Sequence, residues 1–309
     1  MPAGQSTRMD RITLERGGWR ADVAPALGGG LLSAAFAGVD VLRPATAEGI
    51  GAGDPLSLAC FPLVPFSNRI RRGRFSFRGV HVALSAPAVT EPEVIHGFGW
   101  TARWQPQAVD PHACSLTFVH DGGAWPWPFT ARRHVRLSET SLELALSVEN
   151  TGEAAMPLGL GFHPYFPKSA DCHLHAPVSG LWVSGADRLP IRHQRVDGAL
   201  GFQQPQAVAD LDLDHCFTGW SGTARIDWPE RGLAVRLEAG GPLDHLVLYV
   251  PPTADFFCVE PVSHMVDAFN WDGGPDDTGT LVLDPGQSVG ASMALTPERS
   301  GEAGDVSGH

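Results

Sequence analysis

The sequence predicts an all-β protein, built as one large antiparallel β-sandwich, and three observations lead to this fold class. Apolar residues alternate with other residues along most of the chain, which is the pattern of half-buried strands. Thirty-six glycines and 26 prolines are spread between the alternating segments, where they would form turns. No amphipathic helix longer than two or three turns, no break in composition and no internal repeat interrupts the pattern. We therefore expect the 309 residues to form a single domain.

Several strands can be placed from the alternation alone. They are expected where apolar residues alternate at 80–84, 142–148, 233–237, 246–250 and 289–295. The tetrapeptide Ser138–Ser141 (SETS) is typical of a hairpin loop between two of them. Within the single domain, 1–309, the core is expected over about residues 15–296, with loose polar ends at residues 1–10 and from about residue 298 onward.

Composition and charge exclude several classes of protein. Hydrophobic residues make up 43% of the chain and charged residues 18%, which supports a well-filled core and argues against disorder. The formal net charge of −12 disfavours nucleic acid and anionic membrane as partners. The five cysteines form no CxxC motif and are expected to be reduced and mostly buried. Without a signal-peptide core or a run of about 18 apolar residues, we expect a soluble, cytoplasmic protein.

Residues 158–166 (LGLGFHPYF) are typical of a strand that carries a histidine among aromatic side chains. Pro164 fixes its own φ and restricts His163 to an extended conformation. The glycines at positions 159 and 161 would leave room beside the strand for a close approach. A histidine held in this way could transfer protons on a sugar, or it could be an ordinary core histidine.

A second histidine, His96, begins the segment HGFGW that ends at Trp100. Gly97 and Gly99 would permit close approach of a ligand, and Trp100 could stack on the apolar face of a sugar ring. Core packing explains this combination poorly, although HGF is a weak motif when taken alone.

Charged residues complete the candidate site. Glu260 follows an apolar, strand-like run and precedes a proline, so its carboxylate would be partly buried and therefore paired or functional. Asp214 adjoins an apolar Cys-Phe pair and is expected to point inward, whereas the two aspartates before it are expected to be solvated. Arg69, next to Asn68, could grip an oxygen-rich ligand with its fork of donors.

Other motifs are better explained without chemistry. Gly28–Gly30 lacks the GK[ST] ending and the following helix of a phosphate loop. His173 and His175 would share one face of a strand, but no glutamate follows closely, so surface residues are favoured over metal ligands. The basic run 71–74 (RRGR) is expected to be solvated on one face of a strand.

Five short motifs together resemble the aldose 1-epimerase (galactose mutarotase) family. Their order and spacing match over roughly residues 15–296, and five motifs in register are specific although each alone is weak. They are NRI at 68–70, HGFGW at 96–100, GFHPYF at 161–166, LDHCF at 213–217 and CVEP at 258–261.

The resemblance implies a galactose mutarotase-like supersandwich with an open sugar-binding cleft. It implies interconversion of the α and β anomers of a free aldose, with Glu260 as catalytic base and His163 as catalytic acid. A small sugar would be the partner of a monomer or homodimer that needs no metal and no organic cofactor. The expected substrate-binding residues are Asn68, Arg69, His96 and Asp214, to which the aromatic Trp100 is added from its own residue pattern.

Two departures from the family pattern bear on sugar specificity more than on the reaction. Pro167 follows HPYF where many relatives carry asparagine, and residues 261–270 form a variant segment. A hexose-6-phosphate 1-epimerase remains an alternative if arginines of the run 71–74 face the cleft, and so does a non-catalytic sugar-binding module. To serve as an acid near neutral pH, His163 would need an anion such as Glu260 to hold its proton.

Overall fold

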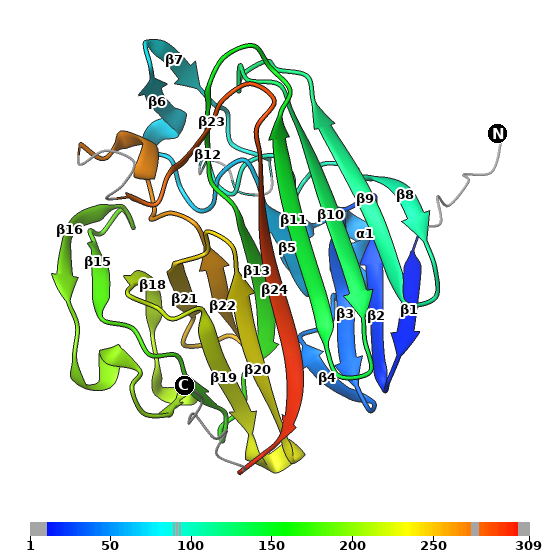
Figure 1. Ribbon diagram of the computed structural model, residues 1–309. Coiled ribbons are helices and arrows are strands. Elements are labelled where there is room, and N and C mark those ends of the chain that lie inside the picture. Colours follow the sequence, from blue (N-terminus) through cyan, green and yellow to red (C-terminus); the bar gives the residue numbers. More distant parts are fainter. Residues whose placement is uncertain (1–10, 89, 91, 93, 273–277, 302–309) are drawn as a thin grey trace, which may run out of the picture.

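In the computed structural model, two large antiparallel sheets pack against each other (Figure 1), as the sequence predicts. The structure describes residues 11–88, 90, 92, 94–272 and 278–301. Within these residues the α-helix is α1, Ala47–Ala52, which Thr46 caps by accepting a hydrogen bond from the Gly49 N–H. The short 3₁₀ turns are η1 (Pro55–Ser57), η2 (Arg71–Gly73), η3 (Gly198–Gly201), η4 (Val208–Asp210), η5 (Pro229–Arg231) and η6 (Ala268–Asn270).

The larger sheet has eleven strands, and β13 from the middle of the sequence lies near its centre. Neighbouring strands in this sheet are antiparallel, and β4 (Val39–Leu42) pairs with β3 beside the main order. The main order is β1 (Ile12–Arg16), β2 (Trp19–Ala24), β3 (Gly30–Phe36), β5 (Cys60–Leu63), β13 (Gly161–Pro167), β22 (Phe256–Val262), β21 (His245–Val250), β18 (Leu213–Thr218), β15 (Gly180–Ser184) and β16 (Pro190–Arg195).

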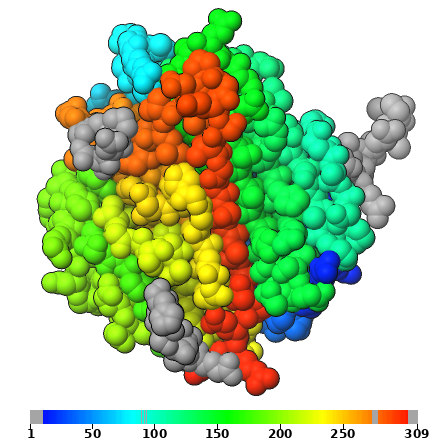
Figure 2. All heavy atoms as spheres, in the orientation of Figure 1, coloured from blue at the N-terminus to red at the C-terminus, as the bar shows by residue number. Residues whose placement is uncertain are grey.

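The second sheet has nine strands and forms the face that Figure 2 shows. The long strand β24 crosses this face as a red stripe between β20 in yellow and β11 in green. The order is β17 (Gln206–Ala207), β14 (His173–His175), β19 (Thr223–Trp228), β20 (Leu233–Gly240), β24 (Ser288–Arg299), β11 (Leu142–Asn150), β10 (Phe129–Leu137), β9 (Ala113–His120) and β8 (Gln105–Val109). Two separate pairs are β6 (Arg74–Phe77) with β7 (Val80–Ala83), and β12 (Met156–Leu158) with β23 (Leu281–Leu283).

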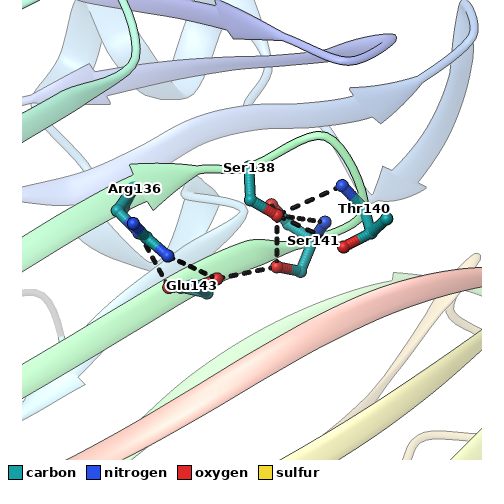
Figure 3. A network of polar contacts seen from close by, with 5 residues as sticks. All are labelled: Arg136, Ser138, Thr140, Ser141 and Glu143. Atoms are coloured by element: carbon teal, nitrogen blue, oxygen red, sulfur yellow. Dashed lines mark hydrogen bonds and ion pairs between the residues drawn. The ribbon is translucent and has the colours of Figure 1, made fainter.

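The hairpin between β10 and β11 has the loop that the sequence predicts (Figure 3). The hydroxyl of Ser138 accepts hydrogen bonds from the main-chain N–H groups of Thr140, at 3.1 Å, and Ser141, at 2.9 Å. Beside the loop, Arg136 on β10 donates two hydrogen bonds to the Glu143 carboxylate on β11. Residues along both strands alternate between the core and the outer surface, as expected for half-buried strands.

The central strands of the eleven-stranded sheet depart from this alternation. Every residue of β13 and six of the seven residues of β22 are buried. One apolar cluster fills the space between the two sheets. A second lies on the outer face of the eleven-stranded sheet, where Leu58, Trp100 and Met265 from connecting segments pack against Phe61 and Val247 from strands. Loops therefore cover part of this outer face and form the walls of a cleft.

The strands placed from alternation are confirmed as β7, β11, β20, β21 and β24, and all five cysteines are free and buried. The C-terminal expectation needs one correction. β24 continues to Arg299 in register with β20, and Glu298 accepts hydrogen bonds from Arg225 on β19 and Arg236 on β20. The expected loose ends at residues 1–10 and 302–309 lie outside the described residues.

Candidate active site

The register of the central strands places His163 opposite Glu260. β13 pairs with β22 so that Tyr165 lies opposite Cys258, and two residues further along on the same face His163 meets Glu260. The Nε2 atom of His163 lies 3.3 Å from Oε1 of Glu260, and both side chains are almost fully buried. Antiparallel pairing of two strands that are far apart in the sequence thus brings together the two groups that the sequence proposes as acid and base.

Burial determines the charge state of this pair. It lowers the pKa of His163 from 6.5 to about 3, and the charge of Arg43 adds to the lowering. It raises the pKa of Glu260 well above the usual 4.5, and the negative charge of Asp214 adds to the rise. Both shifts favour the neutral form of the group concerned, so a proton shared by the pair is expected to favour Glu260 over His163. The expectation that Glu260 keeps His163 protonated is wrong, because desolvation outweighs the attraction between the two groups.

Asn68 and His96 hold each other through reciprocal hydrogen bonds. The His96 N–H donates to the Asn68 carbonyl at 3.0 Å, and the Asn68 N–H donates to Nδ1 of His96 at 3.1 Å. Burial lowers the pKa of His96 well below 6.5, so the ring is neutral and its proton is assigned to Nε2. Oδ1 of Asn68 accepts from both the main-chain N–H and Nη1 of Arg69, which orients the guanidinium.

Asp214 projects from β18 between two arginines. Its Oδ2 atom lies 3.1 Å from Nη1 of Arg188 and 3.8 Å from Nη1 of Arg69. Arg188 comes from the turn between β15 and β16 and is more than half exposed. Sequence reasoning missed Arg188, because a single arginine in a polar turn belongs to no motif and only the fold brings it to Asp214.

A cavity of about 330 Å³ lies above these residues, a volume in the range of small-molecule sites. Of the residues expected at the site, it is lined by Asn68, Arg69, His96, His163, Asp214 and Glu260. Its lining also includes Arg188, Tyr165, Tyr249 and Val247.

Trp100 is the one expected site residue that the cavity does not reach. Its side chain is fully buried, its Nε1 donates to the Gly97 carbonyl, and its ring packs 5.3 Å from that of Phe61. The expectation that Trp100 stacks directly on a sugar is therefore wrong. Tyr165 and Tyr249 are the aromatic residues that line the cavity instead.

The glycines near the two histidine motifs make room for the protein chain itself. A Cβ atom on Gly97 would lie 2.3 Å from the Val64 carbonyl oxygen. On Gly159 it would lie 1.9 Å from the ring of His264. The expected close approach is real, but the approaching group is a loop or a ring of this chain and not a ligand.

One group of three donor atoms among the described residues could hold a metal ion by distance alone. Donor atoms of His163, Cys258 and Glu260 lie within 4.8 Å of one another. Burial raises the pKa of the Cys258 thiol well above 9, so that deprotonation of this ligand would add to the cost of metal binding. The absence of a metal requirement stays a prediction.

The other polar motifs lie away from this cavity. His173 and His175 on β14 line a separate cavity of about 510 Å³ beside the nine-stranded sheet. Arg71 donates from its main chain and its Nε to the carboxylate of Asp267. None of the arginines of the run 71–74 lines the cleft cavity.

Residues 10–296 match the family model described as aldose 1-epimerase. This match spans nearly the whole chain. The chain belongs to the aldose 1-epimerase family. The resemblance inferred from the five motifs is thereby confirmed at the level of the family.

Relatives of this epimerase-family chain agree in fold. It is 31% identical to the uncharacterized Escherichia coli K12 protein YphB over 94% of this chain and 99% of that one. A crystal structure of a candidate aldose 1-epimerase from E. coli K12 superposes with a TM-score of 0.85 at 30% identity, covering 94% and 99% of the two chains. A galactose mutarotase-like protein from Clostridium acetobutylicum gives 0.83 at 20% identity, covering 93% and 94%. Among the described residues of this family member, no helix is long and apolar enough to span a bilayer.

Proposed function

We propose that the protein is an aldose 1-epimerase that interconverts the α and β anomers of a neutral free aldose. The observation that carries the proposal is the buried pair of His163 and Glu260, with Nε2 and Oε1 3.3 Å apart, which lines a cavity of sugar size. Proton transfer between a sugar and a protein needs one acid and one base within hydrogen-bonding reach. A pair that holds one proton supplies both.

In the proposed reaction, Glu260 as carboxylate removes the proton from the anomeric hydroxyl. The C1–O5 bond breaks as C1 becomes an aldehyde carbon, and its electron pair moves to the ring oxygen O5, which receives a proton from His163. Rotation about the C1–C2 bond presents the other face of the aldehyde, and the ring closes with the roles of the two residues reversed. Each assisted transfer contributes about 10²–10⁴-fold to the rate.

In the proposed resting state the shared proton lies on Glu260, and it moves across the 3.3 Å contact to His163 before Glu260 acts as base. The proton count of the pair is the same in both arrangements. The reaction therefore needs the pair to hold one proton, whichever residue carries it. Turnover should be level through neutral pH and fall at alkaline pH, where Glu260 loses the proton and the pair contains no acid.

The remaining cavity residues are suited to the hydroxyl groups of a sugar. His96 offers an Nε2–H donor, Arg69 a guanidinium and Asp214 a carboxylate that accepts hydrogen bonds. Tyr249 offers apolar ring surface, which is common in small-molecule sites. Both arginines in the cavity face Asp214, which compensates one of their two positive charges. None of the arginines of the run 71–74, on which the hexose-6-phosphate alternative depends, lines the cavity, and this favours a neutral aldose.

Polarimetry tests the proposal directly. Fresh α-D-glucose, α-D-galactose and L-arabinose should each be assayed with and without the protein, beside a hexose 6-phosphate. We expect at least one neutral sugar to reach its equilibrium rotation faster than it does spontaneously, and the phosphosugar to gain little. Binding of a sugar without any acceleration would instead support the non-catalytic sugar-binding module.

A further inference from the structure

Arg43, which belongs to none of the sequence motifs, lies directly behind the candidate acid–base pair. It follows β4 and its main-chain N–H donates to the carbonyl of Tyr165 at 2.8 Å. Its guanidinium carbon lies 4.4 Å from the centre of the Tyr165 ring and 4.7 Å from that of Phe256. A cation at this distance is attracted to the ring face of an aromatic residue.

The guanidinium is fixed by main-chain carbonyl groups. Its Nη2 atom donates to the carbonyl oxygens of Leu56, Ser57 and Leu58 at 3.0–3.2 Å. Among the described residues no carboxylate pairs with Arg43, so its positive charge is compensated only by dipoles. Leu56 and Tyr165 both line the cleft cavity, so Arg43 contacts two parts of its lining.

Tyr165 continues this arrangement to the candidate acid. The rings of Tyr165 and His163 are stacked, with centroids 4.7 Å apart and planes 17° from parallel. Phe61 also contacts the imidazole, at 4.6 Å between centroids. Arg43, Tyr165 and His163 therefore form a continuous stack that ends at the contact with Glu260.

The charge of Arg43 contributes to the lowered pKa of His163, and Arg69 and Arg188 are the cations that line the same cavity. The titratable groups that face His163 are Glu260 and Cys258 on β22, Tyr165 on its own strand and His96 from the loop above. A positive charge near an imidazole disfavours its protonated form. The charge of Arg43 thus opposes transfer of the shared proton from Glu260 to His163.

We propose that Arg43 is a positioning residue which, through the Tyr165 ring, orients His163 and holds the shared proton on Glu260 in the resting site. Arg43 touches no substrate in this scheme and acts only through its neighbours. The inference deepens the proposed function, because the position of the proton sets how often Glu260 is available as a base.

Nitrogen-15 NMR of the imidazole rings at a fixed neutral pH tests this inference. The His163 resonances can be assigned by their loss in His163→Asn. Arg43→Met keeps an unbranched apolar side chain but lacks the charge, so the His163 signals should move toward those of imidazolium. The expected shift corresponds to at least about a threefold increase in the ratio of the form with the proton on His163 to the form with the proton on Glu260. In Arg43→Lys, which keeps the charge but not the fork, the change should be smaller.

Arg78→Met is the matched control, since Arg78 lies over the ring of Phe77 at 5.4 Å on the separate hairpin β6–β7 and should leave His163 unchanged. Should Arg43→Met fail to fold, Arg43→Gln also removes the charge and can still donate to the carbonyl groups. Unchanged His163 signals in the folded uncharged variant would overturn the inference, as would equal shifts in Arg43→Met and Arg78→Met. The NMR measurement does not depend on turnover. The inference about Arg43 can therefore fail in an active enzyme and hold in an inactive protein.

Discussion

On the outer face of the nine-stranded sheet, charged side chains stand in solvent and pair across neighbouring strands, as Arg132 does with Glu149 and Arg136 with Glu143. On the outer face of the eleven-stranded sheet, His163 and Glu260 lie beneath loops and are almost fully buried. Both faces come from antiparallel strands. Solvation makes the difference, because exposed pairs interact weakly, whereas burial shifts the pKa values of His163 and Glu260 toward their neutral forms.

This contrast shows where chemistry can be found in an all-β protein. Strands with clean alternation, such as β10 and β11, show where the core lies. A central strand that is buried on both faces and still carries ionisable residues, such as β13, marks a site instead.

The largest expected effect separates the two cleft histidines. His163→Asn should lower kcat by at least about 10²-fold with little change in KM, because the candidate acid is lost while the other cavity residues remain. His96→Asn should mainly raise KM, since His96 is expected to be a hydroxyl contact. Steady-state polarimetry on both variants distinguishes these outcomes. If His96→Asn abolishes turnover and His163→Asn only raises KM, the two roles are reversed.

A second effect concerns acid stability. Nδ1 of His264 contacts the Met265 carbonyl at 2.6 Å, and its Nε2 accepts from the Ser67 N–H, which requires a neutral ring. Burial lowers the pKa of His264 from 6.5 to about 4. Since the unfolded chain binds this proton from about pH 6.5 downward, the stability it contributes is lost as pH falls from about 6.5 to about 4. The loss amounts to about 3 kcal/mol.

Denaturant titrations at pH 7 and pH 4 measure this loss. His264→Gln keeps an acceptor in place of the imidazole but cannot titrate, so its stability should fall less between the two pH values than that of the wild type. His81→Gln, on the exposed hairpin β6–β7, should behave as the wild type. An unchanged pH dependence in His264→Gln would show that His264 is not the acid-sensitive group.

Removal of metal ions should have no effect on turnover. Proton transfer by His163 and Glu260 needs no Lewis acid, so activity should survive dialysis against EDTA. Loss of activity that a single divalent ion restores would contradict this, and would direct attention to the trio of His163, Cys258 and Glu260.

The smallest effect is expected on the nine-stranded sheet. Glu143→Gln breaks the paired hydrogen bonds with Arg136 shown in Figure 3, but an exposed ion pair contributes little to stability. Thermal unfolding and mutarotation should both match the wild type within error. A clear loss of activity would contradict the expectation that this surface pair does not affect the cleft.

The sequence predicts most of the fold because alternation survives wherever one face of a strand meets solvent. It also indicates His163, through the proline that follows, and Glu260, through the apolar run before it. The prediction that Trp100 faces a sugar is wrong, because a Gly-rich aromatic segment has the same sequence pattern whether its ring faces a ligand or a neighbouring side chain such as Phe61.

Other features depend on contacts that no single segment contains. Neither Arg188 nor Arg43 lies in a motif. They reach the site because the fold places the turn between β15 and β16, and the end of β4, beside it. The resting position of the proton depends on burial, which the order of residues does not reveal.

The most direct test of the central claim compares Glu260→Gln with Glu143→Gln in the same polarimetric assay, on a neutral aldose that the wild type accelerates. Both variants replace a carboxylate on a strand by an amide of the same shape. The account predicts a fall of at least about 10²-fold for Glu260→Gln, with the fold intact, and none for Glu143→Gln. A Glu260→Gln protein within a fewfold of the wild type would contradict it and remove Glu260 from the mechanism.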